Sequence, residues 1–389
     1  MLEKDLYCKF GLIGENLELK QNINLSVDKE GKISELKFDE IEAEINFNRT
    51  RENYVIIPGL INSHTHIGDS FAKEKGHDKG LIEVVSPPNG IKHQLLRETS
   101  NTQKVKGIKY AIHEMISNGI TYFIDFRENG VKGIELLQRA LKDEDINCLI
   151  FGRFDQTDEL QEVFNKSDGI GLSSYHHLTD DVKLDLRTMK TVLSKKIACH
   201  VAEFNHDPIL LNQILEEALV DIIVHGTQLK ISDLQKIKEK KIKIVLCPRS
   251  NGYFGLGFPP IKEMLKLNIP FSLGTDNVMV NNLNLFEEMR YLYYIVRNQI
   301  KEEDLGNFNA KNILKMVTIN AAKNFNIESK VGSISSGKIA DLVMIDLNHP
   351  NFYVNELEKA EFFSLLLHRT NVRNIRKVYI RGKLIYESN

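Results

Sequence analysis

Eight short apolar segments, spaced along the middle of the chain, most constrain its fold. Each is rich in β-branched residues and short enough to be a buried strand. They are residues 55–66, 120–127, 148–154, 170–176, 197–203, 222–227, 242–249 and 271–277. Amphipathic segments typical of helices lie between or after them, at residues 131–142, 184–194, 208–219, 231–240, 260–267, 283–298 and 310–325. This alternation predicts an α/β fold with a closed (β/α)8 TIM-type barrel, whose catalytic groups gather at the C-terminal ends of the strands.

The two ends of the chain have a different pattern. Residues 1–54 contain short segments in which apolar and polar residues alternate, as in a sheet with one solvated face. Residues 330–389 contain a similar strand at 340–346 and a hairpin at 372–385. Because a sheet from one end alone would be marginally stable, we predict that both ends join in a small β-sandwich domain. The barrel domain then spans residues 55–329.

The composition excludes several classes of function. The chain has 51 Lys and Arg against 53 Asp and Glu, without a basic stripe, which argues against nucleic acid as a partner. The four cysteines are scattered without a Cys-x-x-Cys pair, so they form no disulfide framework and fit a reducing compartment. The first residues are charged and no run of 18 apolar residues occurs, so we expect a cytoplasmic protein without a signal peptide or membrane span.

Polar residues at three of the predicted strand ends form a candidate metal site. His64 and His66 end the first strand and, being two residues apart, point the same way. His200 lies at the end of the fifth strand and Asp276 at the end of the eighth. Three neutral imidazoles and one carboxylate suit Zn²⁺ or Fe²⁺ and leave a coordination position open for water. An unpaired polar group in such apolar strands would be costly, which favours a ligand role for His200 and Asp276.

Two further residues complete a hydrolytic site. A divalent ion lowers the pKa of a bound water toward neutrality, so that hydroxide can attack a trigonal carbon. Asp276 could also accept a proton from the attacking water, and His225, at the end of the sixth strand, could orient the water or stabilise the developing oxyanion. Glu203 could carry a proton to a leaving nitrogen; a surface glutamate at a strand exit is the alternative.

The same residues carry a resemblance to a known family. Pro58-Gly-Leu-Ile-Asn-Ser-His64-Thr-His66 is similar to the opening motif of the amidohydrolase superfamily. His200-Val-Ala-Glu203 resembles the strand-five motif of its aminohydrolase branch, which includes cytosine, guanine and adenosine-derivative deaminases and chlorotriazine hydrolases. Gly274-Thr-Asp276-Asn277 resembles the family's strand eight, and the resemblance covers nearly the whole chain. It implies one divalent metal, zinc with iron(II) as the alternative, bound by His64, His66, His200 and Asp276, with Glu203 and His225 as catalytic partners.

Some segments depart from the family pattern. Members with two metals commonly use a carboxylated lysine at the end of strand four, whereas Ser173-Ser-Tyr-His-His has none, which favours one metal. The long polar segment from Asp69 to Gln94 is predicted to be a lid or binding loop, with a disordered excursion as the alternative. The stretch Asp125-Phe-Arg127-Glu128 at the end of strand two matches no substrate-recognition pattern.

The leading hypothesis for function is an aminohydrolase that releases ammonia from an amidine-like carbon of a purine, pyrimidine or related heterocycle. One alternative is hydrolysis of a cyclic C–N bond, as in imidazolonepropionase, for which the resemblance allows the same set of groups. Another is a non-catalytic barrel used for binding or assembly, although such relatives usually lack metal ligands and none is missing here. We expect a small-molecule substrate and no organic cofactor, and a second copy of the chain as the one macromolecular partner.

Overall fold

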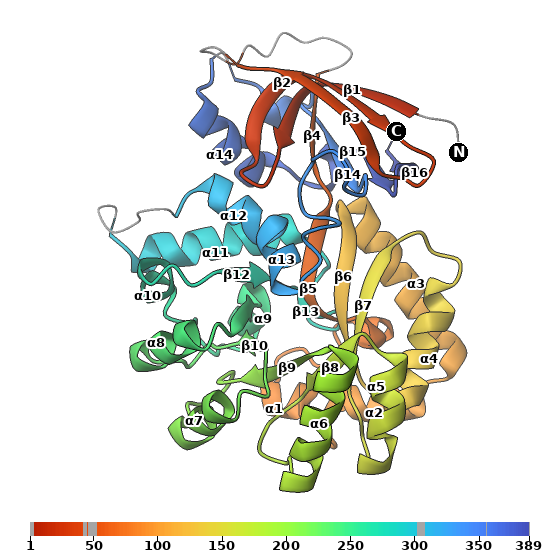
Figure 1. Ribbon diagram of the computed structural model, residues 1–389, viewed down its shortest axis with the longest axis vertical. Helices are drawn as coiled ribbons and strands as arrows, with labels where there is room; N and C mark the ends of the chain where they lie inside the picture. The colour runs from red at the N-terminus through yellow and green to blue at the C-terminus, as the bar shows by residue number, and fades with distance from the viewer. Residues whose placement is uncertain (1–3, 42–44, 46–52, 302–307, 355, 389) are drawn as a thin grey trace.

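The computed structural model describes residues 4–41, 45, 53–301, 308–354 and 356–388, and it has two parts (Figure 1). One part is a barrel of parallel strands with helices around it. The other is a sheet at one end of the barrel, to which both ends of the chain contribute. This arrangement confirms the predicted (β/α)8 barrel with a small β domain.

The barrel strands run parallel in the order β12-β11-β10-β9-β8-β7-β6-β5-β13. They are β5 (Leu60–His66), β6 (Ile120–Arg127), β7 (Asn147–Gly152), β8 (Gly169–Leu172), β9 (Lys196–Val201), β10 (Ile222–His225), β11 (Lys243–Leu246), β12 (Phe271–Leu273) and β13 (Asp276–Asn277). Because β12 pairs with β11 and β13 pairs with β5, these two short segments form one interrupted eighth strand that closes the barrel.

The first predicted strand, residues 55–66, is two strands that belong to different sheets. β4 (Tyr54–Pro58) pairs with strands of the terminal sheet, and only β5 belongs to the barrel. The apolar run is continuous because both strands are buried, so its pattern does not mark the break. The chain passes between the sheets at Gly59, where a Cβ would lie 2.1 Å from the Thr121 hydroxyl oxygen. The domain limits at residues 54 and 329 stay a proposal, and most of β4 lies on the barrel side of the first limit although the strand pairs with the terminal sheet.

The terminal sheet has seven strands in the order β16-β15-β14-β4-β1-β2-β3. They are β1 (Lys4–Ile13), β2 (Glu18–Val27), β3 (Ile33–Asp39), β4, β14 (Leu342–Asp346), β15 (Ile375–Ile380) and β16 (Lys383–Glu387). The two chain ends meet where β4 pairs with β1 on one side and with β14 on the other. All seven strands are hydrogen-bonded in one continuous order. Residues 1–3, 42–44 and 46–52 of the predicted N-terminal unit lie outside the described residues.

Helices follow most of the barrel strands and pack their apolar faces against them. They are α3 (Asn101–Ser117), α4 (Gly130–Leu141), α5 (Leu160–Lys166), α6 (Asp180–Leu193), α7 (Pro208–Glu217), α8 (Ile231–Glu239), α9 (Pro248–Tyr253), α10 (Ile261–Lys266), α11 (Leu285–Gln299), α12 (Ala310–Met316) and α13 (Ile319–Asn324). Side chains fix several starts: Asp207 accepts hydrogen bonds from the first backbone amides of α7, as Ser100 does for α3. Within the described ranges, we find no helix with the length and apolar character needed to cross a bilayer.

Three helical predictions were wrong or incomplete. The predicted helix 310–325 is interrupted between α12 and α13, because Thr318 has non-helical backbone angles. The sequence reading missed α3 and also α14 (Lys359–Arg369) in the C-terminal unit. The predicted loop from Asp69 to Gln94 is half helical: it includes most of η1 (Ile67–Ala72), α1 (Leu81–Val85) and the start of α2 (Ile91–Glu98). Buried residues one turn apart, such as Leu81 and Val84, give α1 its apolar face.

Candidate metal centre and active site

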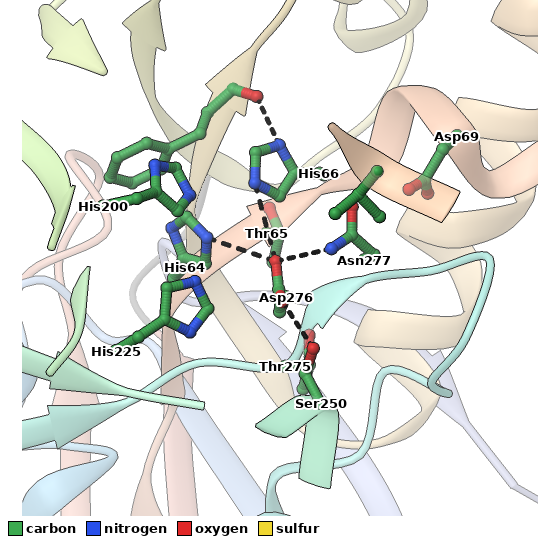
Figure 2. Close-up of polar contacts among 12 residues, drawn as sticks. His64, Thr65, His66, Asp69, His200, His225, Ser250, Thr275, Asp276 and Asn277 are labelled. Atoms are coloured by element: carbon green, nitrogen blue, oxygen red, sulfur yellow. Dashed lines mark hydrogen bonds and ion pairs between the residues drawn. The ribbon is translucent and has the colours of Figure 1, made fainter. Parts of the chain in front are cut away.

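The C-terminal ends of the barrel strands bring all six predicted site residues together. They are His64 and His66 on β5, His200 on β9, His225 on β10, Asp276 on β13, and Glu203 just beyond β9. Figure 2 shows the four imidazoles and the Asp276 carboxylate facing one another. Their convergence follows from the closed barrel, because strands distant in sequence end on the same rim.

The donor atoms form two groups that share His64, and each group could hold an ion. Asp276 Oδ1 lies 3.3 Å from His64 Nε2 and 3.5 Å from His66 Nε2. One ligand atom each from His64, His66 and His200 lie within 4.8 Å of one another, and so do atoms of His64, His225 and Asp276. Imidazole and carboxylate donors at this spacing fit a divalent transition metal.

Hydrogen bonds orient two of these imidazoles. Nδ1 of His66 lies 2.9 Å from the Phe126 carbonyl oxygen, and Nδ1 of His200 lies 2.9 Å from the Leu172 carbonyl oxygen. Since a carbonyl only accepts, each Nδ1 carries the proton and each Nε2 keeps a free lone pair. A second hydrogen bond of this kind is the usual support of a metal-binding histidine.

His64 has a different environment. Its side chain is fully buried, and neither ring nitrogen makes a hydrogen bond to any described residue. The contact of Nε2 with Asp276 at 3.3 Å lacks hydrogen-bond alignment. A buried imidazole without hydrogen bonds is costly unless another partner binds it. The orphaned nitrogens of His64 therefore fit a metal ligand.

Burial sets the protonation states of the site. It lowers the pKa of His64 to about 4 and that of His66 to about 3, so both are neutral at neutral pH, as metal ligands must be. Burial alone would raise the pKa of Asp276. Its neighbours His64 and His225 lower that pKa by more, so it lies well below the ordinary value and the carboxyl is ionised. Burial also raises the pKa of Glu203, which favours its protonated form.

His225 has the opposite tautomer to His66 and His200. The Asn251 amide donates to Nδ1 of His225 at 3.3 Å, so the ring proton is on Nε2. That Nε2 lies 3.4 Å from Glu203 Oε1. A donor N–H directed into the site is suited to bind a developing oxyanion.

The backbone at His225 and Asp276 is strained. Their φ angles are 72° and 63°, in the left-handed region that non-glycine residues rarely adopt. Such conformations cost about 1–3 kcal/mol and cluster at active sites. Hydrogen bonds hold the Asp276 carboxylate in place: Ser250 Oγ donates to Oδ2 at 2.5 Å and Asn277 Nδ2 donates to Oδ1 at 3.0 Å.

A pocket of about 480 Å³ opens directly onto this centre. His66, His200, Glu203, His225 and Asp276 lie on one side of it. The segment around α1 and α2 supplies another side with Leu81, Val85, Ser86, Pro87 and Lys92, and Arg153 and Ser173 complete the lining. A second pocket shares Ser173, His200 and Glu203 with it and extends over Phe204 and His206. The first pocket therefore joins the candidate metal centre to the segment around α1 and α2.

Comparisons with known proteins agree with this geometry. The family model described as "Amidohydrolase family" matches residues 55–385. The chain belongs to the amidohydrolase family. An uncharacterized protein of Methanocaldococcus jannaschii is 39% identical over 303 residues, which cover 73% of this chain and 76% of that protein. A 5-methylthioadenosine/S-adenosylhomocysteine deaminase of Thermoanaerobacter pseudethanolicus is 28% identical over 96% of this chain and 91% of its own.

Solved structures share the fold. An adenosine deaminase from Xanthomonas campestris, solved with bound zinc, superposes with a TM-score of 0.82 at 20% identity, over 97% of this chain and 91% of that one. The amidohydrolase is thus a hydrolase of C–N bonds with a candidate site for a divalent metal.

Sequence reasoning missed a buried charged cluster beside the centre of the amidohydrolase. Its members are Asp69, Lys92, Asp125, Arg127 and Glu128. Arg127 contacts Glu128 at 2.6 Å and Asp125 at 3.2 Å, and Lys92 forms an ion pair with Glu128. The stretch from Asp125 to Glu128 gave a signal, because charges at the end of an apolar strand need partners. Lys92 gave none, since it lies in a polar segment.

Proposed function

We propose that the amidohydrolase is a metal-dependent aminohydrolase that releases ammonia from an amidine-like carbon of a purine, pyrimidine or related heterocycle. The observation that carries this proposal is the pair Glu203 and His225, which lies 3.4 Å apart beside the histidine cluster. Relatives named as methylthioadenosine/S-adenosylhomocysteine deaminase and 5'-deoxyadenosine deaminase support the reaction class.

The proposed metal site consists of His64, His66, His200 and Asp276. Zinc is the proposed ion, because the donor set suits it and the adenosine deaminase with the same fold was solved with zinc. When bound, a divalent cation supplies Lewis acidity, which makes water a nucleophile near neutral pH. The lack of a lysine at the end of β8, where Ser173 follows Leu172, supports a single ion.

The chain's own residues then divide the proton transfers. Asp276, held by Ser250 and Asn277, accepts the proton of the attacking water. His225 donates its Nε2 proton in a hydrogen bond to the oxygen that becomes negatively charged at the attacked carbon. Glu203 gives its proton to the ring nitrogen that takes up the C–N electron pair, regains a proton from the new hydroxyl group and passes it to the amino nitrogen, which departs as ammonia. The proton that Asp276 accepted then restores the protonated form of Glu203. Its burial favours the protonated form that the first transfer requires.

The experiment that tests the function combines metal analysis with an ammonia assay. Purified protein is analysed by elemental mass spectrometry and then screened for ammonia release from adenine, guanine, cytosine and their nucleosides. About one zinc or iron per chain together with ammonia supports the proposal. A ring-opened product without ammonia would instead support cyclic C–N hydrolysis. Protein that cannot be loaded with metal would support a non-catalytic barrel.

A further inference from the structure

The pocket wall that follows β5 includes one buried lysine. We call residues 81–98, which comprise α1 and α2, the α1–α2 wall. Lys92, near the start of α2, is 3% exposed and lines the pocket. A buried ammonium requires hydrogen-bond acceptors for its three protons. Its acceptors therefore show what the α1–α2 wall is attached to.

One contact of Lys92 leads to His66. The ammonium forms an ion pair with Glu128 Oε1, and the same oxygen lies 2.7 Å from His66 Nδ1. That ring nitrogen also faces the Phe126 carbonyl oxygen at 2.9 Å. A carboxylate beside the distal nitrogen fixes the orientation of a ligand imidazole and raises its basicity. Lys92 and Arg127, which contacts the other oxygen of Glu128 at 2.6 Å, hold this carboxylate in place.

A second contact of Lys92 leads to Asp276, while a third acceptor, Asp69 Oδ2, lies 3.7 Å from the ammonium. Its ammonium donates to Asn277 Oδ1 at 2.7 Å, and Asn277 Nδ2 donates to Asp276 Oδ1 at 3.0 Å. Asp276 Oδ1 lies 3.3 Å from His64 Nε2 and 3.5 Å from His66 Nε2. A single ammonium thus reaches two proposed metal ligands through two separate side chains.

We propose that Lys92 is a positioning residue that couples the α1–α2 wall to the metal centre. It orients His66 through Glu128 and Asp276 through Asn277. Metal binding in turn fixes those two ligands, so it orders the wall that faces the substrate. This inference rests on the metal site of the proposed function, but it concerns metal affinity and the order of the wall instead of the reaction.

The test compares Lys92→Met with Lys183→Met. Lys183 is also buried and pairs with a glutamate, Glu217, at 3.1 Å, but it lies on α6 outside the pocket lining. Zinc affinity is measured by competition with a chromophoric chelator, and amide hydrogen exchange is followed across residues 81–98 with and without zinc. We expect Lys92→Met to weaken zinc binding about 10- to 100-fold, the range for lost support of a ligand. We also expect amide hydrogen exchange at residues 81–98 of zinc-loaded Lys92→Met to approach the rate seen in the zinc-free wild-type protein.

Two further variants keep the test valid if Lys92→Met does not fold. Lys92→Met/Glu128→Gln removes both charges of the ion pair, and Asn277→Ala interrupts only the path to Asp276. We expect zinc affinity to fall in both. Zinc affinity within twofold of wild type in folded variants would overturn the proposal, as would wild-type exchange at residues 81–98 that is unaffected by zinc.

The outcome is independent of turnover. A protein that binds zinc but releases no ammonia would contradict the proposed function and leave the role of Lys92 standing. Unchanged zinc affinity in a Lys92 variant that still releases ammonia would contradict the role of Lys92 and leave the proposed function standing. Wild-type protein that binds no zinc would overturn both.

Discussion

Glu203 Oε1 lies 3.4 Å from Nε2 of His225, and the two side chains come from neighbouring strands of the barrel rim. His225 is fixed in its tautomer by Asn251, whereas burial raises the pKa of Glu203 and so favours its protonated form. The pair therefore consists of one group set to donate a hydrogen bond and one group set to exchange a proton. The proposed division of roles can be tested residue by residue.

Replacing Glu203 with Gln should remove turnover and keep the metal. The amide cannot transfer a proton, so we expect kcat to fall about 10²- to 10⁴-fold. Metal content should stay at the wild-type level, because Glu203 is not a proposed ligand. Glu216→Gln, an exposed glutamate on α7, is the matched control. Loss of metal from the Glu203 variant would refute its assignment as a proton carrier.

Replacing Asn251 with Leu should test the tautomer of His225. Without the Asn251 donor, the His225 proton is free to move to Nδ1, and its hydrogen bond to the oxyanion is weakened. We expect kcat to fall with little change in KM. The fall in kcat should be smaller than that of His225→Ala, for which we expect a loss of about 10²- to 10³-fold. Steady-state kinetics on both variants would measure this difference. A larger effect from Asn251 than from His225 would contradict the assigned role.

Removing a proposed ligand should remove the metal. We expect His64→Ala and Asp276→Ala to lower bound metal well below one ion per chain when measured by elemental analysis after dialysis. His206→Ala is the control, since His206 pairs with Asp233 at 2.9 Å outside the cluster. Wild-type metal content in the His64 and Asp276 variants would break the site assignment.

Zinc affinity should depend only weakly on pH between 7.5 and 5.5. Histidines with an ordinary pKa near 6.5 would each lose about tenfold in metal affinity at pH 5.5, because the proton competes with the metal. Burial lowers the pKa of His64 to about 4 and of His66 to about 3, so both stay neutral down to those values. Competition is expected to begin only as pH falls through about 4. Competition titrations with a chelator from pH 7.5 to 5.5 measure the zinc affinity. A thousandfold loss of zinc affinity by pH 5.5 would show that the imidazoles are solvated.

Gly274 should tolerate no side chain. A Cβ there would lie 2.7 Å from the backbone nitrogen of His64 and 2.8 Å from its carbonyl oxygen, and neither backbone atom can rotate away. We expect Gly274→Ala to cost about 1–3 kcal/mol of unfolding free energy and to lower metal content by displacing His64. Gly80→Ala, where a Cβ meets nothing within 4 Å, is the control for thermal denaturation and metal analysis.

The sequence predicted the parts of the site that lie on strand ends. His64, His66, His200, His225 and Asp276 could be found because each interrupts an apolar run where a closed barrel places its chemistry. The structure brings them together, while their individual roles stay proposals. The same reasoning predicted the barrel and the sheet made from both chain ends, and the structure confirms them.

Other features depend on packing that a local pattern does not contain. Lys92 lies in a segment rich in charges, and only the position of α2 against β6 and β13 shows that it is buried. The break at Gly59 was hidden because both flanking strands are buried, so their apolar residues form one run. Helix α3 was missed because its buried residues are interspersed with lysines and polar side chains.

The closure of the barrel by β13 has a consequence for assembly. Asp276 pairs with Thr65 and Asn277 with His66, so proposed ligands from the first and last strands meet at the seam where the barrel closes. A cation held by His64, His66 and Asp276 would cross-link that seam, and His200 would extend the cross-link to a strand across the lumen. Loss of the ion would remove this cross-link and leave the seam to the backbone pairing of β13 with β5.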